Sequence, residues 1–336
     1  MSYNQNSGYG AALLNRLYNV AASVCPTFGR VLVVMSPDDS ADPNFQALQE
    51  ICKVDNEGAV RFYTDLEDAY DAVTTNNNDV ILLDGHSTHI LNSGQLTVSK
   101  NRTHFVGMDG GERLHGQGAK IQNIAGTAAI SVVYVTGTRN TFRNIKFIQN
   151  DDEATSLNVL KEAGESTLYK NCSFIFGDVD NLDQTNAYEI LMSGDSTEFH
   201  NCTFGADTLV TSAARAVVAF DVITTAAKSS VWKDCVWNIL SSSADANFIR
   251  VVATTDLHFG HIFINPVFLA TISNASSAIT LTDAVDSVSG LNAGNMLMIN
   301  PATNCTNLSS AASDNLKVVA MGDAATTLAG IGITPA

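Results

Sequence analysis

One short pattern recurs five times between residues 139 and 269 and limits the folds open to this chain. The pattern reads aromatic, any residue, Asn or Asp, small or apolar, any residue, aromatic. Its copies are Phe142–Phe147, Tyr169–Phe174, Phe199–Phe204, Trp232–Trp237 and Phe263–Phe268, and their first aromatics are spaced by 27, 30, 33 and 31 residues. Repeats of this length are typical of solenoids, in which each unit buries its apolar face against its neighbours.

Each copy alternates inward aromatic residues with outward polar ones, which is the period of a β-strand. A second apolar run precedes each copy by a similar distance, as at residues 130–135 and 157–160. Each period therefore holds at least two short strands, a tight bend and a longer loop. Chains of this kind coil into a parallel β-helix, in which each strand pairs with its equivalent about 4.8 Å away.

Equivalent positions of successive coils should stack in columns. The first and last aromatics of the copies predict two aromatic ladders inside the coil. The third position predicts a ladder at a bend, because Asn tolerates left-handed backbone and its amide can bond to the next Asn. Cysteines at the fourth position should be buried, reduced thiols. The bend ladder is Asn144, Asn171, Asn201, Asp234 and Asn265, and the thiol ladder is Cys172, Cys202 and Cys235.

With these ladders the chain resembles the right-handed parallel β-helices of the pectate-lyase-like superfamily, and most of all those found on bacteriophage virions. The resemblance covers about residues 64–270. It implies the fold more than the chemistry, since the same helix serves lyases, hydrolases, phage tailspikes and inert virion proteins.

The expected fold is all-β: a right-handed parallel β-helix solenoid with an N-terminal α/β capping region and a β-rich C-terminal tail. We predict an N-terminal arm and small docking region at 1–63, the β-helix with its helical cap at 64–270, and an oligomerisation tail at 271–336. The tail contains no aromatic residue, so we expect neighbouring subunits to help order it.

Three helices are predicted in the N-terminal part. Residues 11–22 form an amphipathic pattern that should dock on the chain's own body or on a partner. Asp42 and Pro43 suit the start of a second helix. Thr64–Glu67 has the spacing of a capping box and should begin a helix that covers the open end of the coil.

The charge balance disfavours several classes of function. Eighteen basic residues against 34 acidic ones give a net charge of −16, which repels phosphate backbones and anionic lipid, so neither nucleic acid nor membrane is an expected partner. No apolar run has the length of a transmembrane helix, and the N-terminus lacks the basic region of a secretory signal. We therefore expect a protein made in a host cytoplasm.

Cofactor chemistry is not expected either. The sequence has no phosphate-binding loop, no dinucleotide fingerprint and no nucleophile elbow. Two kinds of motif have partial metal-ligand spacing, but none has a full ligand set, so we predict no metal. They are the loop carboxylates Asp178, Asp180 and Asp183, which suit either calcium or a solvated acidic loop, and the pairs His86/His89 and His258/His261.

Outward-facing carboxylates are the candidates for catalysis, because polysaccharide-cleaving β-helices place two of them close together. Glu198 flanks the aromatic repeat, while Glu162, Glu189 and Asp221 lie on the preceding strands. Glu189 and Asp221 are expected on neighbouring coils and form the candidate pair. Isolated outward charges are also typical of solubilising side chains, and we predict that the protein is not an enzyme.

One outward column is basic. Arg143, Lys170, His200 and Lys233 each follow the first aromatic of a copy and should stack about one strand spacing apart. Like charges this close repel one another. Either the acidic loops at 151–153 and 178–183 neutralise them, or they bind an acidic partner, which would be a neighbouring subunit or an anionic glycan.

These observations together favour a structural protein of a bacteriophage virion that docks on other virion proteins and assembles as a homotrimer. The alternative is a tailspike-like protein that binds or degrades a polysaccharide.

Overall fold

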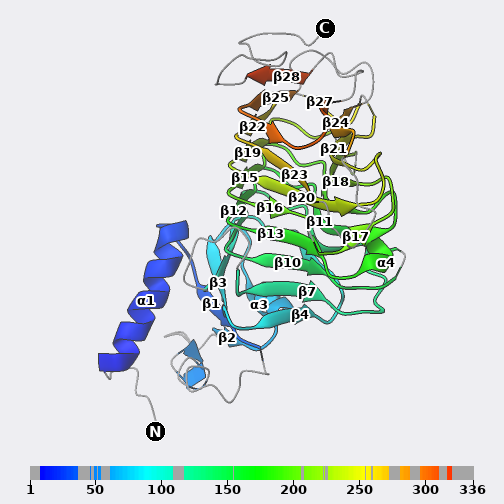
Figure 1. Cartoon of the computed structure of the whole chain (residues 1–336). Helices are drawn as coiled ribbons and strands as arrows, with labels where there is room; N and C mark the ends of the chain where they lie inside the picture. Colours follow the sequence, from blue (N-terminus) through cyan, green and yellow to red (C-terminus); the bar gives the residue numbers. More distant parts are fainter. Residues whose placement is uncertain are drawn as a thin grey trace.

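Among the residues that the computed structural model describes, the strands form three parallel sheets around one core (Figure 1). The described residues are 8–36, 46, 49–50, 52–53, 61–108, 117–271, 281–287, 296–309 and 316–319, without 154, 206–207, 222, 224–225, 254 and 259. Over most of each sheet, neighbouring strands come from successive coils of the chain, and the strand pairings among the described residues are parallel. The predicted parallel β-helix solenoid is confirmed.

The largest sheet carries the first aromatics of the repeat. In spatial order its strands are β2 (Phe62–Tyr63), β1 (Val31–Val34), β3 (Asp79–Leu83), β6 (Thr103–Gly107), β9 (Thr141–Arg143), β12 (Leu168–Lys170), β15 (Glu198–His200), β19 (Val231–Lys233), β22 (His261–Ile264), β25 (Met296–Ile299) and β28 (Leu316–Val319). We call it the eleven-stranded sheet.

The nine-stranded sheet carries the last aromatics of the repeat. Its strands are β4 (Thr88–Leu91), β7 (Lys120–Asn123), β10 (Lys146–Gln149), β13 (Ser173–Phe176), β16 (Thr203–Phe204), β20 (Val236–Ser241), β23 (Val267–Thr271) and β26 (Ala302–Thr303), with β17 (Val210–Thr211) also paired to β20.

The eight-stranded sheet contains the apolar runs that precede each repeat. Its strands are β5 (Leu96–Val98), β8 (Ser131–Val135), β11 (Asn158–Glu162), β14 (Tyr188–Met192), β18 (Ala216–Phe220), β21 (Asn247–Val251), β24 (Asp283–Ser287) and β27 (Asn307–Ser309).

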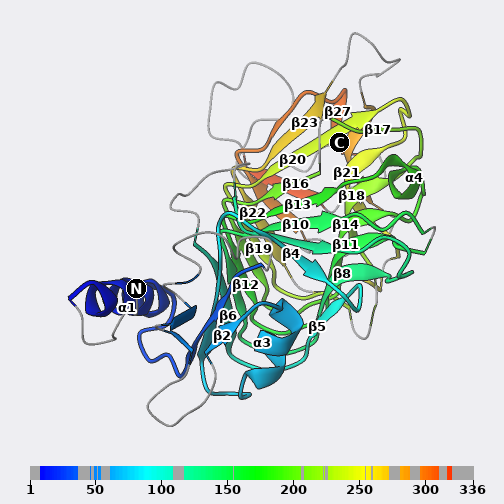
Figure 2. The same ribbon diagram turned by 90° about the horizontal axis from the view of Figure 1, so that it is seen from below.

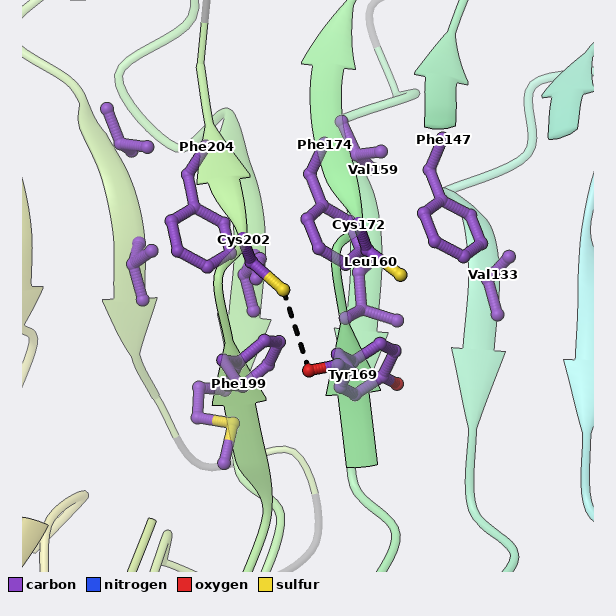
Figure 3. Close-up of a cluster of buried hydrophobic side chains, with 14 of the residues drawn as sticks. Val133, Phe147, Val159, Leu160, Tyr169, Cys172, Phe174, Phe199, Cys202 and Phe204 are labelled. Atoms are coloured by element: carbon purple, nitrogen blue, oxygen red, sulfur yellow. Dashed lines mark hydrogen bonds between the residues drawn. The ribbon is translucent and has the colours of Figure 1, made fainter. Parts of the chain in front are cut away.

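Both predicted aromatic ladders run through the core. Along the first ladder, the rings of Phe142 and Tyr169 have centroids 5.0 Å apart and those of Tyr169 and Phe199 4.7 Å apart, in stacked geometry. Along the second, Phe147 stacks on Phe174 at 4.9 Å. Figure 3 shows the two rows of rings facing each other across the core. The aromatics therefore set the strand register, because a slip of one residue would turn every ring to the solvent.

A short helix closes one end of the core, as predicted. Helix α3 (Leu66–Ala72) lies at that end of the coil (Figure 2). It buries Leu66 and Tyr70, and the Tyr70 ring stacks at 6.0 Å on Phe105, which in turn stacks on Phe142 of the first ladder. The expected capping residue was wrong, however. Asp65 and not Thr64 is the N-cap, since its carboxylate accepts hydrogen bonds from the backbone N–H groups of Glu67 and Asp68.

Helix α1 (Gly8–Val24) packs on the chain's own body. Its Leu17 and Ala21 are buried against the outer face of the first strands of the eleven-stranded sheet, beside Val33 and Val80. This contact favours the first of the two predicted docking modes. No helix in the described part of the chain is long and apolar enough to cross a membrane.

Strand pairing does not break at the predicted domain boundaries. Strands β1 and β2 precede residue 64 and extend the eleven-stranded sheet. Strands β24 to β28 follow residue 270 and extend all three sheets. The described part of the tail therefore consists of further coils of the solenoid. The helix predicted from Asp42 falls mostly outside the described residues.

Candidate functional site

A column of basic side chains runs along the outer face of the eleven-stranded sheet. Strands β9, β12, β15 and β19 pair so that Arg143, Lys170, His200 and Lys233 are direct neighbours on successive coils. The inward positions beside them hold the first aromatic ladder, so strand alternation turns these four side chains outward. Lys233 is exposed, and the other three are half-buried. We call these four residues the cation column.

Apolar residues bound the cation column at both ends. The equivalent residue on β6 is Val106, which belongs to the cluster that helix α1 covers. The equivalent residue on β22 is Ile264. The four basic residues therefore occupy a defined stretch of the outer face of the sheet, between two apolar positions.

One carboxylate of the same surface contacts the column. Oε2 of Glu198 lies 2.9 Å from Nε2 of His200, and both side chains are partly exposed. Of the loop carboxylates expected to neutralise the column, Asp151 has partners on another loop. Asp151 accepts hydrogen bonds from the Gly126 N–H and the Thr127 hydroxyl, and these bonds outweigh burial and lower the pKa of Asp151.

The predicted outward position of Glu189 was wrong. Its side chain is 1% exposed and forms a buried ion pair with Arg215, with Oε1 2.6 Å from Nη2. Arg215 is also 1% exposed, and its guanidinium carbon lies 5.4 Å from the centre of the Phe176 ring. Burial raises the pKa of Glu189 to about 7, and the Arg215 charge opposes this rise.

Glu189 and Asp221 do not form a catalytic pair. They belong to neighbouring coils, but Ile190 pairs with Val218, so Glu189 is level with Val217 and four residues from Asp221 along the strand direction. Four residues span roughly 13 Å in a strand. Because Glu189 is internal as well, the two carboxylates cannot flank one glycosidic bond.

Glu162 also points into the core and not to the solvent. It is fully buried, accepts a hydrogen bond from the Tyr169 hydroxyl, and accepts another from the Gly164 N–H at 2.6 Å. Burial raises the pKa of Glu162 to about 8. This residue is therefore a protonated structural acid at neutral pH, which no solvent-borne substrate can reach.

The loop carboxylates 178, 180 and 183 stabilise local structure. Asp178 accepts a hydrogen bond from the Asp180 N–H at 2.9 Å, at the start of the short helix α4 (Val179–Leu182). Asp183 accepts one from the Ser212 N–H at 2.6 Å. Within the described residues, no three His, Cys, Asp or Glu side chains are arranged to hold a metal ion.

Neither histidine pair faces a common ligand. His86 is exposed beside Asp84, whereas His89 is buried and contacts the Asp84 carbonyl oxygen through Nε2 at 3.3 Å. His258 is exposed, whereas His261 is fully buried in the core. The i, i+3 spacing does not bring two metal ligands together here, because these pairs lie in or next to strands. In a strand, an odd spacing turns the two side chains to opposite faces.

The bend ladder lies directly after the strands of the eleven-stranded sheet, at the bend that follows each of them. Asn201 donates from Nδ2 to Oδ1 of Asn171 at 2.8 Å, and Asn171 donates to Asn144 at 3.1 Å. Every member has a positive φ, between 52° and 58°. Asn300, which sequence analysis missed, adds one more coil by donating to Asn265 at 3.3 Å. The repeat pattern was hard to recognise around Asn300, because Met298 stands where the other copies have their first aromatic residue.

The thiol ladder lies next to the bend ladder. Cys172, Cys202 and Cys235 are fully buried and reduced. Each thiol faces a backbone oxygen of the neighbouring coil, as Cys202 does with the Tyr169 carbonyl at 3.6 Å (Figure 3). Burial raises the pKa of Cys172 and Cys202 well above the usual range. These are unreactive packing residues.

Comparison with known proteins identifies the fold. No family model and no curated protein matches the sequence. Among solved structures, the pectin methylesterase of Aspergillus niger matches with a TM-score of 0.52 and 14% identity, over 88% of this chain and 87% of the enzyme. A pectin methylesterase in complex with a hexasaccharide matches with a TM-score of 0.54 and 11% identity, over 89% and 92%.

The fold is the right-handed parallel β-helix. At these identities the likeness extends to the fold alone. A protein of Geobacillus virus E2, ORF18, matches with a TM-score of 0.29 and 7% identity, and a likeness this distant gives no support to a virion role.

Proposed function

We propose that this β-helix binds an acidic polysaccharide along the cation column. The observation that carries the proposal is the strand register, which places Arg143, Lys170, His200 and Lys233 side by side on four successive coils. The cations are then about 4.8 Å apart, the spacing of neighbouring strands. A polymer with regularly repeated carboxylates or sulfates can contact several of them at once.

Electrostatics favours a polyanionic ligand over an uncharged one. Stacked like charges repel one another, and an anionic chain laid along them relieves that repulsion. The rest of the protein is acidic, with a net charge of −16, so an anion is directed to this surface and repelled from others.

The fold and the carboxylate positions support binding more than cleavage. A neighbour with the same fold was solved with a hexasaccharide, so this architecture is compatible with an oligosaccharide ligand. Glu162 and Glu189 are internal, and Glu198 contacts the column through His200. Hydrolysis by the usual route needs two such groups.

A binding assay with matched variants tests the proposal. Polygalacturonate should bind the parent protein, and neutral dextran should not. The double variant K170Q/K233Q should lose affinity by about tenfold, since each exposed charge pair contributes up to about 1 kcal/mol. The control K53Q/K161Q removes two positive charges elsewhere and should bind as the parent does. If both variants lose the same affinity, net charge and not the cation column determines binding, and the proposal is wrong.

The virion role and the homotrimer stay predictions from the sequence. Both rest on resemblance, and light scattering of the purified protein would test the trimer directly. Since the described strands of the tail continue the solenoid, we expect a trimer contact to involve the last coils or helix α1.

A further inference from the structure

Two lysines lie side by side on the outer face of the nine-stranded sheet. Lys120 of β7 and Lys146 of β10 are direct neighbours in the strand pairing. The residues that follow them, Ile121 and Phe147, are fully buried in the core, so strand alternation turns both lysines outward. Both side chains are half-buried. We infer that this lysine pair binds the phosphate group of a small phosphorylated sugar.

The two ammonium groups have no acidic partner among the residues that the structure describes. No ion pair or side-chain hydrogen bond between described residues involves either of them. Other lysines are engaged: Nζ of Lys228 lies 3.8 Å from Asp195, and Nζ of Lys161 lies 4.8 Å from the centre of the Tyr134 ring. The lysine pair therefore has both positive charges available for a ligand.

The lysine pair is unfavourable without an anion. Burial, and after it the charge of Lys120, lowers the pKa of Lys146. Like charges on neighbouring strands repel one another, and an anion that contacts both ammonium groups relieves the repulsion. A phosphate monoester carries a charge of about −1.5 to −2 at pH 7, which two lysines match. A carboxylate carries half of that charge or little more.

Hydroxyl groups flank the lysine pair on the same face. Thr88 of β4 is the neighbour of Lys120, and Ser173 of β13 is the neighbour of Lys146. Neighbouring strands are about 4.8 Å apart. Ser173 is 2% exposed and closes the column at one end, so the accessible groups are the two lysines and the half-buried Thr88. All three can donate hydrogen bonds to phosphate oxygens.

A pocket adjoins the column at Thr88. Its volume is about 280 Å³, and its lining includes Ser36, Thr64, Asp65, Thr88, Ile90 and Asn92. Sites for small molecules begin at about 300 Å³, so the pocket has the size for a single sugar ring. Because Thr88 both lines the pocket and neighbours Lys120, one ligand can contact the lysine pair and extend into the pocket.

The lining suits the uncharged part of a sugar. Ser36, Thr64 and Thr88 carry hydroxyl groups, which both donate and accept hydrogen bonds, as sugar hydroxyls do. Ile90 is 45% exposed and gives an apolar side for the C–H groups of a ring.

The carboxylate in the lining fixes which way the ligand lies. Asp65 accepts hydrogen bonds through both oxygens, from the Glu67 N–H at 2.7 Å and from Nδ2 of Asn92 at 2.7 Å. Its negative charge repels an anion. The phosphate group therefore lies at the lysine pair, and the sugar ring lies in the pocket.

Calorimetric titration at neutral pH tests the inference with four probes: glucose 6-phosphate, glucose, galacturonate and inorganic phosphate. We expect glucose 6-phosphate to bind most tightly, because it alone has both the dianion and the ring. The result is separable from that of the proposed polysaccharide binding, since the lysine pair and the cation column lie on different sheets. Equal binding of inorganic phosphate would show that the pocket takes no part, and equal binding of galacturonate would show that the site does not select phosphate.

Variants locate the binding. K120Q/K146Q should weaken glucose 6-phosphate binding about tenfold or more, because charge-assisted hydrogen bonds become neutral ones. An unchanged circular dichroism spectrum is the check on folding. The control K161Q/K228Q removes two positive charges elsewhere and should bind as the parent does. The inference is overturned if glucose 6-phosphate does not bind, if the two double variants bind it alike, or if inorganic phosphate or galacturonate binds as tightly.

Discussion

The hydroxyl oxygen of Ser230 lies 2.6 Å from Nδ1 of His261, in the core where both side chains are fully buried. Nε1 of Trp232 donates to the same hydroxyl oxygen at 2.8 Å, so the Ser230 proton is directed at His261. Nε2 of His261 faces the Ala227 carbonyl at 3.3 Å and carries the ring proton. The histidine is therefore neutral, and burial lowers its pKa to about 4.

This neutral histidine makes stability fall in mild acid. The unfolded chain binds the proton near pH 6.5, and the folded chain does so only near pH 4, so folding loses free energy as the pH falls between these values. The loss amounts to about 3 kcal/mol at the acid end. Because Glu162 titrates in the same range, the test is a difference between two proteins: in urea unfolding from pH 7 to 4, the stability of the parent should fall by about this amount relative to that of H261Q. Identical slopes would contradict the assignment.

Glu162 should act in the opposite direction. Burial raises its pKa from 4.5 to about 8, so the folded chain holds a proton that the unfolded chain releases. Its contribution is complete below pH 4.5 and is lost as the pH rises toward 8. The variant E162Q keeps the shape of the side chain and carries no charge at any pH in this range. Its stability should therefore fall less than that of the parent between pH 5 and 8, and an unchanged slope would show that Glu162 is ionised.

The Glu189–Arg215 pair predicts strong coupling. Removing one partner leaves the other charge buried without compensation, which costs about 3–5 kcal/mol. We expect E189Q and R215M each to destabilise the fold by about that amount, and the double variant to be less destabilised than the sum of the two. Urea unfolding of the four proteins gives the coupling directly. Additive effects would mean that the two charges do not interact.

The strand register could be predicted from the sequence because a large aromatic side chain has to face the core. Tyr169 and Trp232 would each expose a large ring if their strands slipped by one residue. Asn171 could be placed at a bend because few other residues accept a positive φ there. These preferences depend on the residue itself and its neighbours along the chain, so they can be recognised in a single sequence.

The carboxylates could not be placed in the same way. On the eight-stranded sheet, two adjacent residues, Val132 and Val133, both belong to the core, so strict alternation fails at that point of each coil. Glu189 lies in the column of Val132 and was assigned to the wrong face. Its partner Arg215 is 26 residues away along the chain, and only the coil geometry brings the two together.

The six cysteines should divide by reactivity. Cys25 and Cys305 are partly exposed, whereas Cys52 and the three ladder thiols are buried. Burial raises the pKa of Cys52 to about 11, which further slows its reaction. A maleimide reagent should label Cys25 and Cys305 first in the native protein and all six after denaturation. Rapid native labelling of Cys172, Cys202 or Cys235 would contradict the packing described above.

The salt dependence of polygalacturonate binding is the most direct test of the cation column as a binding surface, because it depends on how many charges the ligand contacts. We predict that the affinity of the parent falls steeply as NaCl rises, since screening weakens exposed charge contacts. In the variant R143Q/K170Q/H200Q/K233Q, the affinity should be low and its dependence on NaCl nearly flat. If this variant retains the parent's affinity and salt dependence, the cation column is not the binding surface.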